Sequence, residues 1–332
     1  MDRLGVGIIG LGVFGERHAR IYASMPEARL VAVCSRSADR GQEIAGRYGF
    51  LRRYTDVADL LVDREVDAVS ITTEPARHVK MALAALQAGK HVLLEKPIAT
   101  NLADAGRLVQ AAQGMPGQLM IGHTLRFDVR YAALKEQVAS GRLGCVASIY
   151  ARRNGLGSLF RRKPFLQPML DSGIHDIDLI HWMIEDDVQR VYGLHNNNLE
   201  AHRPDTCWAM MRFQGGAIGV IESSMIMPDH AAVSFDASME IIGDKGVAHL
   251  RVPEQTVAFW LEERTAAPDL GTWAALRDQP VGALCEELRY FVACVRAGSR
   301  VAHGTPDQAF WALRVALAAI ESAEKGGEIV LA

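Results

Sequence analysis

The chain has 332 residues, 49% of them hydrophobic and 23% charged, which is typical of globular proteins and long enough for two domains. Its formal net charge of −3 disfavours nucleic acid and anionic membranes as partners, because both favour basic surfaces. The five cysteines include no CxxC pair, which predicts reduced thiols. The sequence leaves no room for a signal peptide and has no apolar run near the ~20 residues of a membrane span. We therefore expect a soluble, cytoplasmic protein.

The first part of the chain alternates strand and helix signals. Short apolar runs over 6–10, 30–35 and 91–97 are typical of buried parallel strands. Helical segments separate them, including an alanine-rich one that ends at Gly89. Repeated strand–helix units predict an α/β fold with a doubly wound parallel sheet.

The pattern changes after residue 122. Helical segments come first, and alternating apolar runs follow between residues 190 and 262. Regularly spaced runs of this kind predict a large, open, mostly antiparallel sheet, and two helices are expected after it. We therefore predict two domains, over residues 1–122 and 123–332.

The sequence GLGVFG lies between the first predicted strand and the first helix. Gly10 would permit a tight turn, Gly12 a close approach of a pyrophosphate to the backbone, and Gly15 close packing of helix and strand. Val13 and Phe14 complete the turn, and the start of the helix expected over about Glu16–Ala23 would present free N–H groups to phosphates. A glycine turn without a ligand, as in any α/β protein, is the alternative interpretation.

The end of the second predicted strand bears on the choice of cofactor. An acidic residue there would bind the ribose 2′-hydroxyl of NAD, but the sequence has Ser35, Arg36 and Arg40. Hydroxyl and guanidinium groups suit a phosphate dianion. The sequence therefore favours NADP(H), with NAD(H) possible, although an ordinary solvated loop has a similar composition.

A second polar cluster is expected on a helix over 171–184. Asp171, His175 and Asp178 have the spacing of one helix face, whereas His181 lies about 240° around the axis from His175. The two histidines therefore cannot hold one metal ion. Asp171, His175 and Asp178 could in principle do so, but no H-E-x-x-H pattern or set of cysteine ligands supports a metal site, and none is predicted. A purely structural helix capped by Asp171 is the alternative.

Lys96 follows a predicted strand in the sequence LLEKP. Its position is the carboxyl end of the strand, the edge at which open α/β sheets bind ligands. A surface lysine at a strand exit would have the same sequence context.

The combination of these motifs resembles the Gfo/Idh/MocA oxidoreductases. The resemblance rests on GLGVFG with His18, EKP at 95–97 and DSGIHDID at 171–178, and it covers nearly the whole chain. It implies a Rossmann domain for the cofactor, then an α/β domain that binds substrate and whose open sheet joins subunits into a homodimer or homotetramer. It also implies that Lys96, Asp171 and His175 are the catalytic residues and that the Lys96–Pro97 bond is cis.

The implied reaction moves a hydride between a nicotinamide cofactor and a secondary alcohol or ketone of a sugar, sugar derivative or cyclitol. His175 is the expected acid/base, because the ordinary pKa of histidine is near physiological pH. Asp171 would orient the imidazole or accept a hydrogen bond from the substrate, and Lys96 would stabilise charge on the reacting oxygen. Two alternatives are a hydrolase or lyase that cleaves glycosides with tightly bound NAD, and a non-catalytic nucleotide sensor.

Other candidates depend on the resemblance or on their place at strand ends. The further cofactor candidates are Thr72, Thr73, Glu74, His78 and Glu95, together with Lys96. The substrate candidates are His123, Arg126, Arg152 and Asn154, together with Asp171 and His175.

Overall fold

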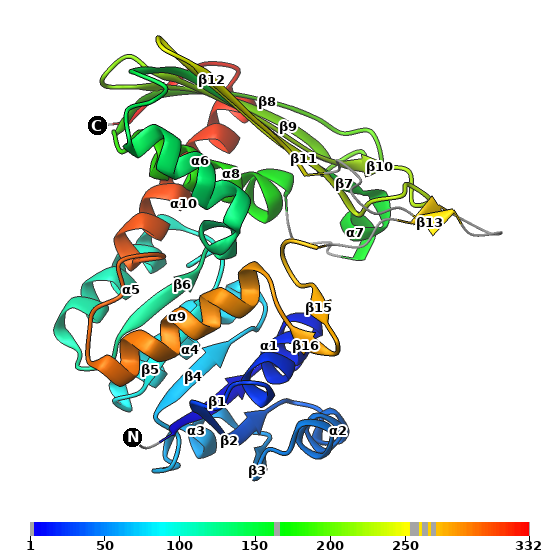
Figure 1. Cartoon of the computed structure of the whole chain (residues 1–332), viewed down its shortest axis with the longest axis vertical. Helices are drawn as coiled ribbons and strands as arrows, with labels where there is room; N and C mark the ends of the chain where they lie inside the picture. The colour runs from blue at the N-terminus through cyan, green and yellow to red at the C-terminus, as the bar shows by residue number, and fades with distance from the viewer. Residues whose placement is uncertain (1–2, 163–166, 253–258, 261–264, 267–269, 332) are drawn as a thin grey trace. The chain divides into compact units, whose positions relative to one another are not determined.

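The computed structural model forms two compact units (Figure 1). The first contains Met1–Phe127 and Gly271–Trp311, and the second contains Asp128–Leu270 and Ala312–Ala332. This grouping differs from a single boundary after residue 122, because a late segment of the chain returns to the first unit. The structure describes residues 3–162, 167–252, 259–260, 265–266 and 270–331.

The first unit is built on a six-stranded parallel sheet with strand order β3-β2-β1-β4-β5-β6. The order reverses between β2 and β4, on either side of β1, so the carboxyl ends of β1 and β4 form the switch point at which such sheets bind ligands. The elements of this unit are β1 (Leu4–Ile9), α1 (Val13–Ala23), β2 (Ala28–Cys34), α2 (Ala38–Tyr48), β3 (Arg52–Tyr54), α3 (Val57–Leu61), β4 (Ala68–Ile71), η1 (Pro75–Arg77), α4 (His78–Gln87), β5 (His91–Glu95), α5 (Leu102–Gly114), β6 (Leu119–Gly122), η2 (Thr124–Phe127), β15 (Ala275–Leu276), β16 (Gln279–Pro280) and α9 (Ala283–Ala297).

Helix α9 explains why residues 271–311 belong to the first unit. Leu284, Leu288 and Phe291 recur on one face of this helix and are buried in the same core as Ile8 of β1 and Tyr22 of α1. The apolar face of α9 therefore covers one side of the parallel sheet, together with α1 and α2. All six residues of β1 are buried, as expected for a central parallel strand.

The second unit is built on a seven-stranded sheet with strand order β12-β11-β7-β10-β9-β8-β17. Its neighbours are antiparallel except for β7 and β10, so the predicted α/β class with a mostly antiparallel second sheet is confirmed. The elements of this unit are α6 (Val129–Ala139), β7 (Val146–Leu156), α7 (Gly157–Arg162), η3 (Met169–Gly173), α8 (Ile174–Ile184), β8 (Val188–Asn196), β9 (Thr206–Phe213), β10 (Ile218–Met227), β11 (Phe235–Gly243), β12 (Val247–Arg251), β13 (Phe259–Trp260), β14 (Thr265–Ala266) and β17 (Ile329–Val330). Helix α10 (Pro306–Lys325) begins in the first unit and continues into this one.

The two faces of this second sheet differ. Helix α8 packs on β7 and β10, and Ala319 of α10 contacts Gly193 of β8, so one face is covered (Figure 1). On the other face Tyr192, Trp208 and Met210 are 41–53% exposed.

The last predicted apolar run, over 256–262, lies mostly outside the described residues. Within the described part of the chain, no helix combines the length and the apolar character that a membrane span requires.

Candidate active site

The glycine turn in the first unit has the shape that its spacing predicts. Gly10 follows β1 with φ of +94°, a conformation that favours glycine, and its carbonyl accepts a 2.6 Å hydrogen bond from Thr72 Oγ1. A Cβ at Gly15 would lie 2.0 Å from the Gly10 carbonyl oxygen, so α1 packs directly against the turn. A Cβ at Gly12 would meet no atom within 4 Å. The space beside Gly12 fits a dinucleotide phosphate approaching the backbone.

An aromatic cluster adjoins this turn. Val13 is exposed, and the Phe14 ring meets the Trp273 ring edge-on at a centroid distance of 6.1 Å. The guanidinium of Arg17 lies 4.0 Å from the centre of the Trp273 ring. Trp273 belongs to residues 271–311, the late segment that rejoins the first unit. Because this segment is distant from Phe14 and Arg17 in the chain, the sequence gave no indication of the contact.

Buried hydrogen bonds fix the ends of β4 and β5. His78 places Nδ1 2.7 Å from the Pro97 carbonyl oxygen and Nε2 3.0 Å from that of Thr73. Burial lowers the pKa of His78 below its ordinary value of 6.5. The carboxylate of Glu95 lies 3.2 Å from His18 Nε2 of α1. These contacts position the Lys96–Pro97 bond, whose predicted cis form is confirmed.

The polar residues after β2 have partners within the chain. Ser35 Oγ accepts from the Ser37 backbone N–H at 3.3 Å. The exposed guanidinium of Arg36 lies 3.9 Å from a Glu74 carboxylate oxygen. Arg40 donates to Glu16 at 2.5 Å and to Glu43 at 2.7 Å. The guanidinium of Arg40 therefore already has two carboxylate partners.

His123 and Arg126 follow β6. Both are buried, and Arg126 Nη1 donates to Gln308 Oε1 at 3.0 Å. Arg126 also lines a pocket of about 450 Å³ with Phe127, Tyr290 and other residues of α9. The roles of His123 and Arg126 toward substrate stay predictions.

In the second unit, Asp171 and His175 lie where a π-helical turn passes into an α-helix. The regular helix predicted over 171–184 begins only at Ile174, and Asp171 belongs to the π-helical turn η3. Ser223 Oγ of β10 donates to the Pro168 carbonyl at 3.1 Å and holds this turn on the sheet. Both Asp171 and His175 are half-buried. π-Helical turns are frequent at functional sites.

A buried ion pair attaches α8 to β7. Arg153 donates to Asp176 through Nε at 3.0 Å and through Nη2 at 2.8 Å, and Nη2 also donates to the Tyr131 hydroxyl at 2.9 Å. Asp176 thus has a structural role. The sequence placed Arg153 at a strand end beside the substrate candidates Arg152 and Asn154 and did not predict its pairing with Asp176, although Arg153 alternates in phase with the buried Ala151 of the same strand.

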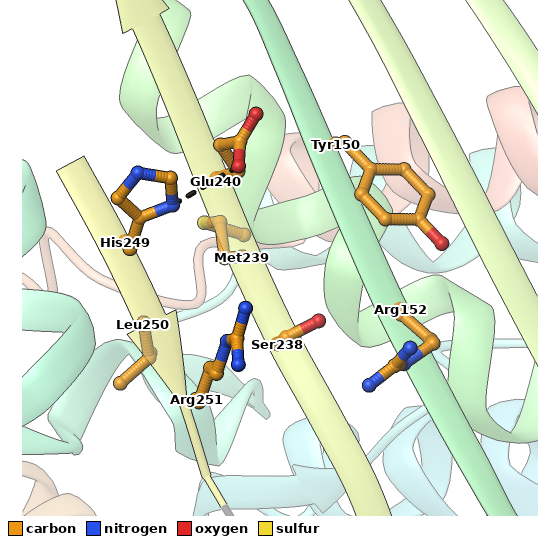
Figure 2. A pocket seen from close by; sticks show the side chains of 8 residues that line it. All are labelled: Tyr150, Arg152, Ser238, Met239, Glu240, His249, Leu250 and Arg251. Carbon is orange, nitrogen blue, oxygen red and sulfur yellow. Dashed lines mark ion pairs between the residues drawn. The ribbon is translucent and has the colours of Figure 1, made fainter. Parts of the chain in front are cut away.

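The predicted substrate residues Arg152 and Asn154 face away from α8. Arg152 pairs with Asp236 of β11, and Asn154 donates to Glu222 of β10 at 2.7 Å. Figure 2 shows Arg152 with Tyr150 of the same strand, beside Glu240 and His249, which form an ion pair at 3.0 Å. These side chains line a pocket of about 250 Å³ on the outer face of the sheet. Their placement gives no support to contact with a substrate at His175.

Among the described residues, no three His, Cys, Asp or Glu side chains converge as a metal site would require.

Both units match known protein families. Residues 4–123 match the oxidoreductase family with an NAD-binding Rossmann fold, and residues 131–249 match the GFO/IDH/MocA C-terminal domain. The chain belongs to the GFO/IDH/MocA oxidoreductase family. The predicted family is therefore confirmed.

Several GFO/IDH/MocA proteins are similar over most of their length. The chain is 29% identical to the myo-inositol 2-dehydrogenase of Thermotoga maritima, over 88% of each chain. It is 30% identical to the inositol 2-dehydrogenase of Rubrobacter xylanophilus, over 75% of this chain and 72% of that one. A structure of scyllo-inositol dehydrogenase from Lactobacillus casei with bound NAD(H) and scyllo-inositol has a TM-score of 0.86, with 25% identity and 99% coverage of both chains.

The NADP(H) preference expected from Ser35, Arg36 and Arg40 is not supported for this GFO/IDH/MocA protein. The family of its first unit is described as NAD-binding, and the similar dehydrogenase from L. casei holds NAD(H). In the structure Arg40 donates to Glu16 and Glu43, so its guanidinium already has two carboxylate partners. Glu16 is 24 residues from Arg40, so the sequence motif alone does not show that they pair.

Proposed function

We propose that this protein is an NAD(H)-dependent dehydrogenase that oxidises a secondary alcohol of a cyclitol or related sugar, or reduces the corresponding ketone. The observation that carries the proposal is the likeness to inositol 2-dehydrogenases, which extends over 88% of the chain in one relative and 75% in another. The substrate class comes from those relatives, because the described side chains alone do not distinguish a cyclitol from a sugar.

The glycine turn supports the cofactor part of this proposal. Gly12 leaves space for a pyrophosphate, and the N–H groups at the start of α1 point toward the same edge of the sheet as the ends of β1 and β4. We assign the pyrophosphate to Gly10–Gly15 and the neighbouring ribose and nicotinamide to Thr72, Thr73 and Glu95. Bound NAD⁺ would supply the hydride acceptor.

We assign catalysis to Lys96, Asp171 and His175. In the oxidative direction His175 accepts the proton of the substrate hydroxyl, and in the reductive direction it returns that proton. The Lys96 ammonium donates to the same oxygen and stabilises the negative charge that develops there. Asp171, four residues before His175 on the same helical segment, orients the imidazole.

We also propose that two copies of the chain associate through the exposed face of the second sheet. Tyr192 faces Met210 and Leu194 faces Trp208 across β8 and β9, so four large apolar side chains, each 41–55% exposed, form one patch. A contiguous apolar patch of this kind is typical of protein interfaces. A second copy in a symmetric arrangement presents the same patch and covers it.

The test is a panel of myo-inositol, scyllo-inositol, other cyclitols and aldoses, each incubated with NAD⁺, with formation of NADH followed by absorbance. The proposal expects NADH to accumulate with at least one cyclitol or sugar, in proportion to the product. Cleavage of a glycoside without net NADH would instead establish the hydrolase or lyase alternative. No turnover of any panel member, by a preparation that binds NADH, would contradict the proposed substrate class.

A further inference from the structure

A closed square of charges lies beside the glycine turn. Arg40 donates to Glu16 Oε2 at 2.5 Å and to Glu43 Oε2 at 2.7 Å. Arg47 donates to the other oxygen of each carboxylate, Glu16 Oε1 and Glu43 Oε1. Two guanidinium groups are thus balanced by two carboxylates. Helix α1, which begins at the glycine turn, contributes Glu16, and helix α2 contributes the other three residues.

The same square connects Arg40 to the turn itself. Arg40 Nε donates to the Leu11 carbonyl, between Gly10 and Gly12, at 3.0 Å. Every nitrogen of its guanidinium therefore has an acceptor: one carbonyl and two carboxylates. The hydrogen bond from Arg40 contributes most to lowering the pKa of Glu16, so this carboxylate stays charged at neutral pH.

Cofactor choice in this fold depends on charges near the ribose 2′ position. An acidic residue favours the 2′-hydroxyl of NAD, whereas a nearby arginine accommodates the 2′-phosphate of NADP. Arg40 lies shortly after β2, where such an arginine is expected. To bind Arg40, however, a 2′-phosphate would have to replace its hydrogen bonds to Glu16 and Glu43. The phosphate dianion would also meet the negative charges of both carboxylates.

We infer that Glu16 sets the preference for NAD(H) by holding Arg40 in this square, although the loop after β2 has no carboxylate. The inference rests on the proposed function, since it requires this edge of the sheet to bind a nicotinamide dinucleotide. Glu16 acts through Arg40 and is a specificity residue, not a catalytic one. Neutralising Glu16 frees one side of the guanidinium for the 2′-phosphate.

The experiment measures NADH and NADPH affinities by fluorescence titration, without substrate, for the full-length protein and its variants. We expect the wild type to bind NADH more tightly than NADPH. In Glu16→Gln, affinity for NADPH should rise by about tenfold, which is equivalent to ~1.4 kcal/mol and is typical of a hydrogen bond to a charged group. Affinity for NADH should change much less. In Glu16→Gln/Arg40→Gln the gain should disappear.

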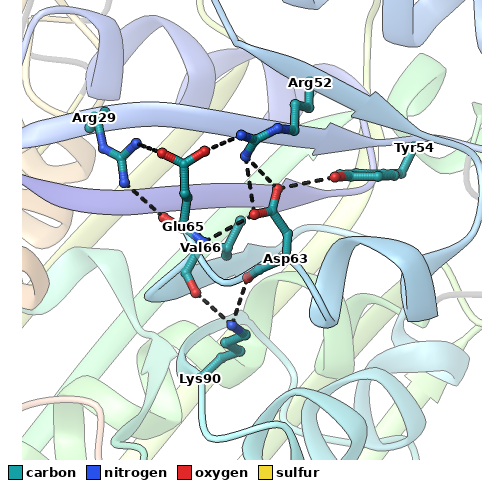
Figure 3. A network of polar contacts seen from close by, with 7 residues as sticks. All are labelled: Arg29, Arg52, Tyr54, Asp63, Glu65, Val66 and Lys90. Carbon is teal, nitrogen blue, oxygen red and sulfur yellow. Dashed lines mark hydrogen bonds and ion pairs between the residues drawn. The ribbon is translucent and has the colours of Figure 1, made fainter.

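Glu65 supplies the matched control. Its carboxylate also pairs with two arginines, Arg29 and Arg52 (Figure 3). Glu65 precedes β4, however, so it lies at the amino-terminal ends of the strands and not at the carboxyl ends beside the glycine turn. Glu65→Gln should therefore leave the ratio of the two affinities unchanged. Glu43→Gln, which frees the other side of the Arg40 guanidinium, is a second test variant should Glu16→Gln fail to fold, and NADH binding reports a folded site in each variant.

The outcomes separate this inference from the proposed function. Tight binding of NADH, with a tenfold gain for NADPH that depends on Arg40, supports both. A wild type that binds NADH but shows no gain in either the Glu16 or the Glu43 variant overturns the inference alone. A wild type that prefers NADPH overturns it as well. A protein that binds neither dinucleotide overturns the proposed function and the inference with it.

Discussion

Arg153 and Asp176 form a two-point ion pair in the interior of the second unit, with both hydrogen bonds at 2.8–3.0 Å. Burial alone would lower the pKa of Arg153, but the attraction of Asp176 outweighs it and raises that pKa above its ordinary value. Because Asp176 directly follows His175, the pair fixes the turn that presents His175. It holds α8 against β7 by a contact that tolerates little displacement.

Removing one member of this pair should destabilise the protein strongly. Asp176→Ala leaves a buried guanidinium uncompensated, so the free energy of unfolding should fall by about 3–5 kcal/mol in urea denaturation. Arg153→Met/Asp176→Leu should recover part of that loss, because both charges are removed together. Arg190→Ala, in the half-exposed pair with Glu328, should cost less than about 1 kcal/mol. Equal costs for the buried and exposed pairs would contradict this account.

The buried His78 predicts a particular pH dependence of stability. Burial lowers its pKa in the folded protein below the ordinary value of 6.5, so the unfolded chain binds a proton first as pH falls. The stability that neutral His78 contributes is present above pH 6.5 and is lost as pH falls from there through the folded-state pKa. Between about pH 7.5 and about pH 5, unfolding free energy should therefore fall more steeply in the wild type than in His78→Gln. Parallel curves for the two proteins would show that His78 does not titrate in this way.

The proposed acid/base role of His175 can be separated from a structural role. His175→Asn should lower kcat/KM for oxidation of the best panel substrate by about 10²–10⁴-fold, with NADH binding retained. The rise of kcat/KM with pH that reflects loss of the imidazolium proton should flatten in the same variant. His181→Asn, on another face of α8, should retain the activity and the pH profile. A His175→Asn variant with an unaltered profile would rule out His175 as the base.

Sequence patterns predicted the parts of the molecule that depend on local spacing. Gly10, Gly12 and Gly15 lie at the turn as expected, and the Lys96–Pro97 bond is cis, as the family resemblance implied. Contacts between distant segments were not predictable in this way. The return of α9 to the first core depends on packing over more than 150 residues of chain, and the partners of Arg40 become visible only when α1 and α2 are side by side.

The choice between neighbouring residues was also beyond the sequence. Arg152 and Arg153 occupy opposite faces of β7, and the strand pattern does not state which face receives α8. In the structure Arg153 pairs with Asp176 of α8, whereas Arg152 pairs with Asp236 on the outer face of the sheet. Likewise, the helical spacing of Asp171 and His175 gave no sign of the π-helical turn that contains Asp171.

The exposed patch on β8 and β9 predicts how association can be disrupted. Trp208→Glu/Met210→Lys places charges on the outer face, where both side chains are 41–53% exposed, so the fold itself should be little affected. In sedimentation velocity at micromolar concentration the variant should be smaller than the wild-type oligomer. Val62→Glu, which alters an exposed apolar residue of the first unit, should sediment like the wild type. A double variant of unchanged size would place any association elsewhere.

Two glycines of the same turn should respond oppositely to alanine. At Gly15 a methyl group would lie 2.0 Å from the Gly10 carbonyl oxygen, so Gly15→Ala must shift α1 and should lower the free energy of unfolding by about 1–3 kcal/mol. At Gly12 the added methyl meets no atom within 4 Å, and φ is −71°, a value that alanine accepts readily. Gly12→Ala should therefore keep wild-type stability. Because its methyl occupies the space assigned to the pyrophosphate, the same variant should bind NADH at least about tenfold more weakly in fluorescence titration. Unimpaired NADH binding by Gly12→Ala would move the pyrophosphate away from this turn.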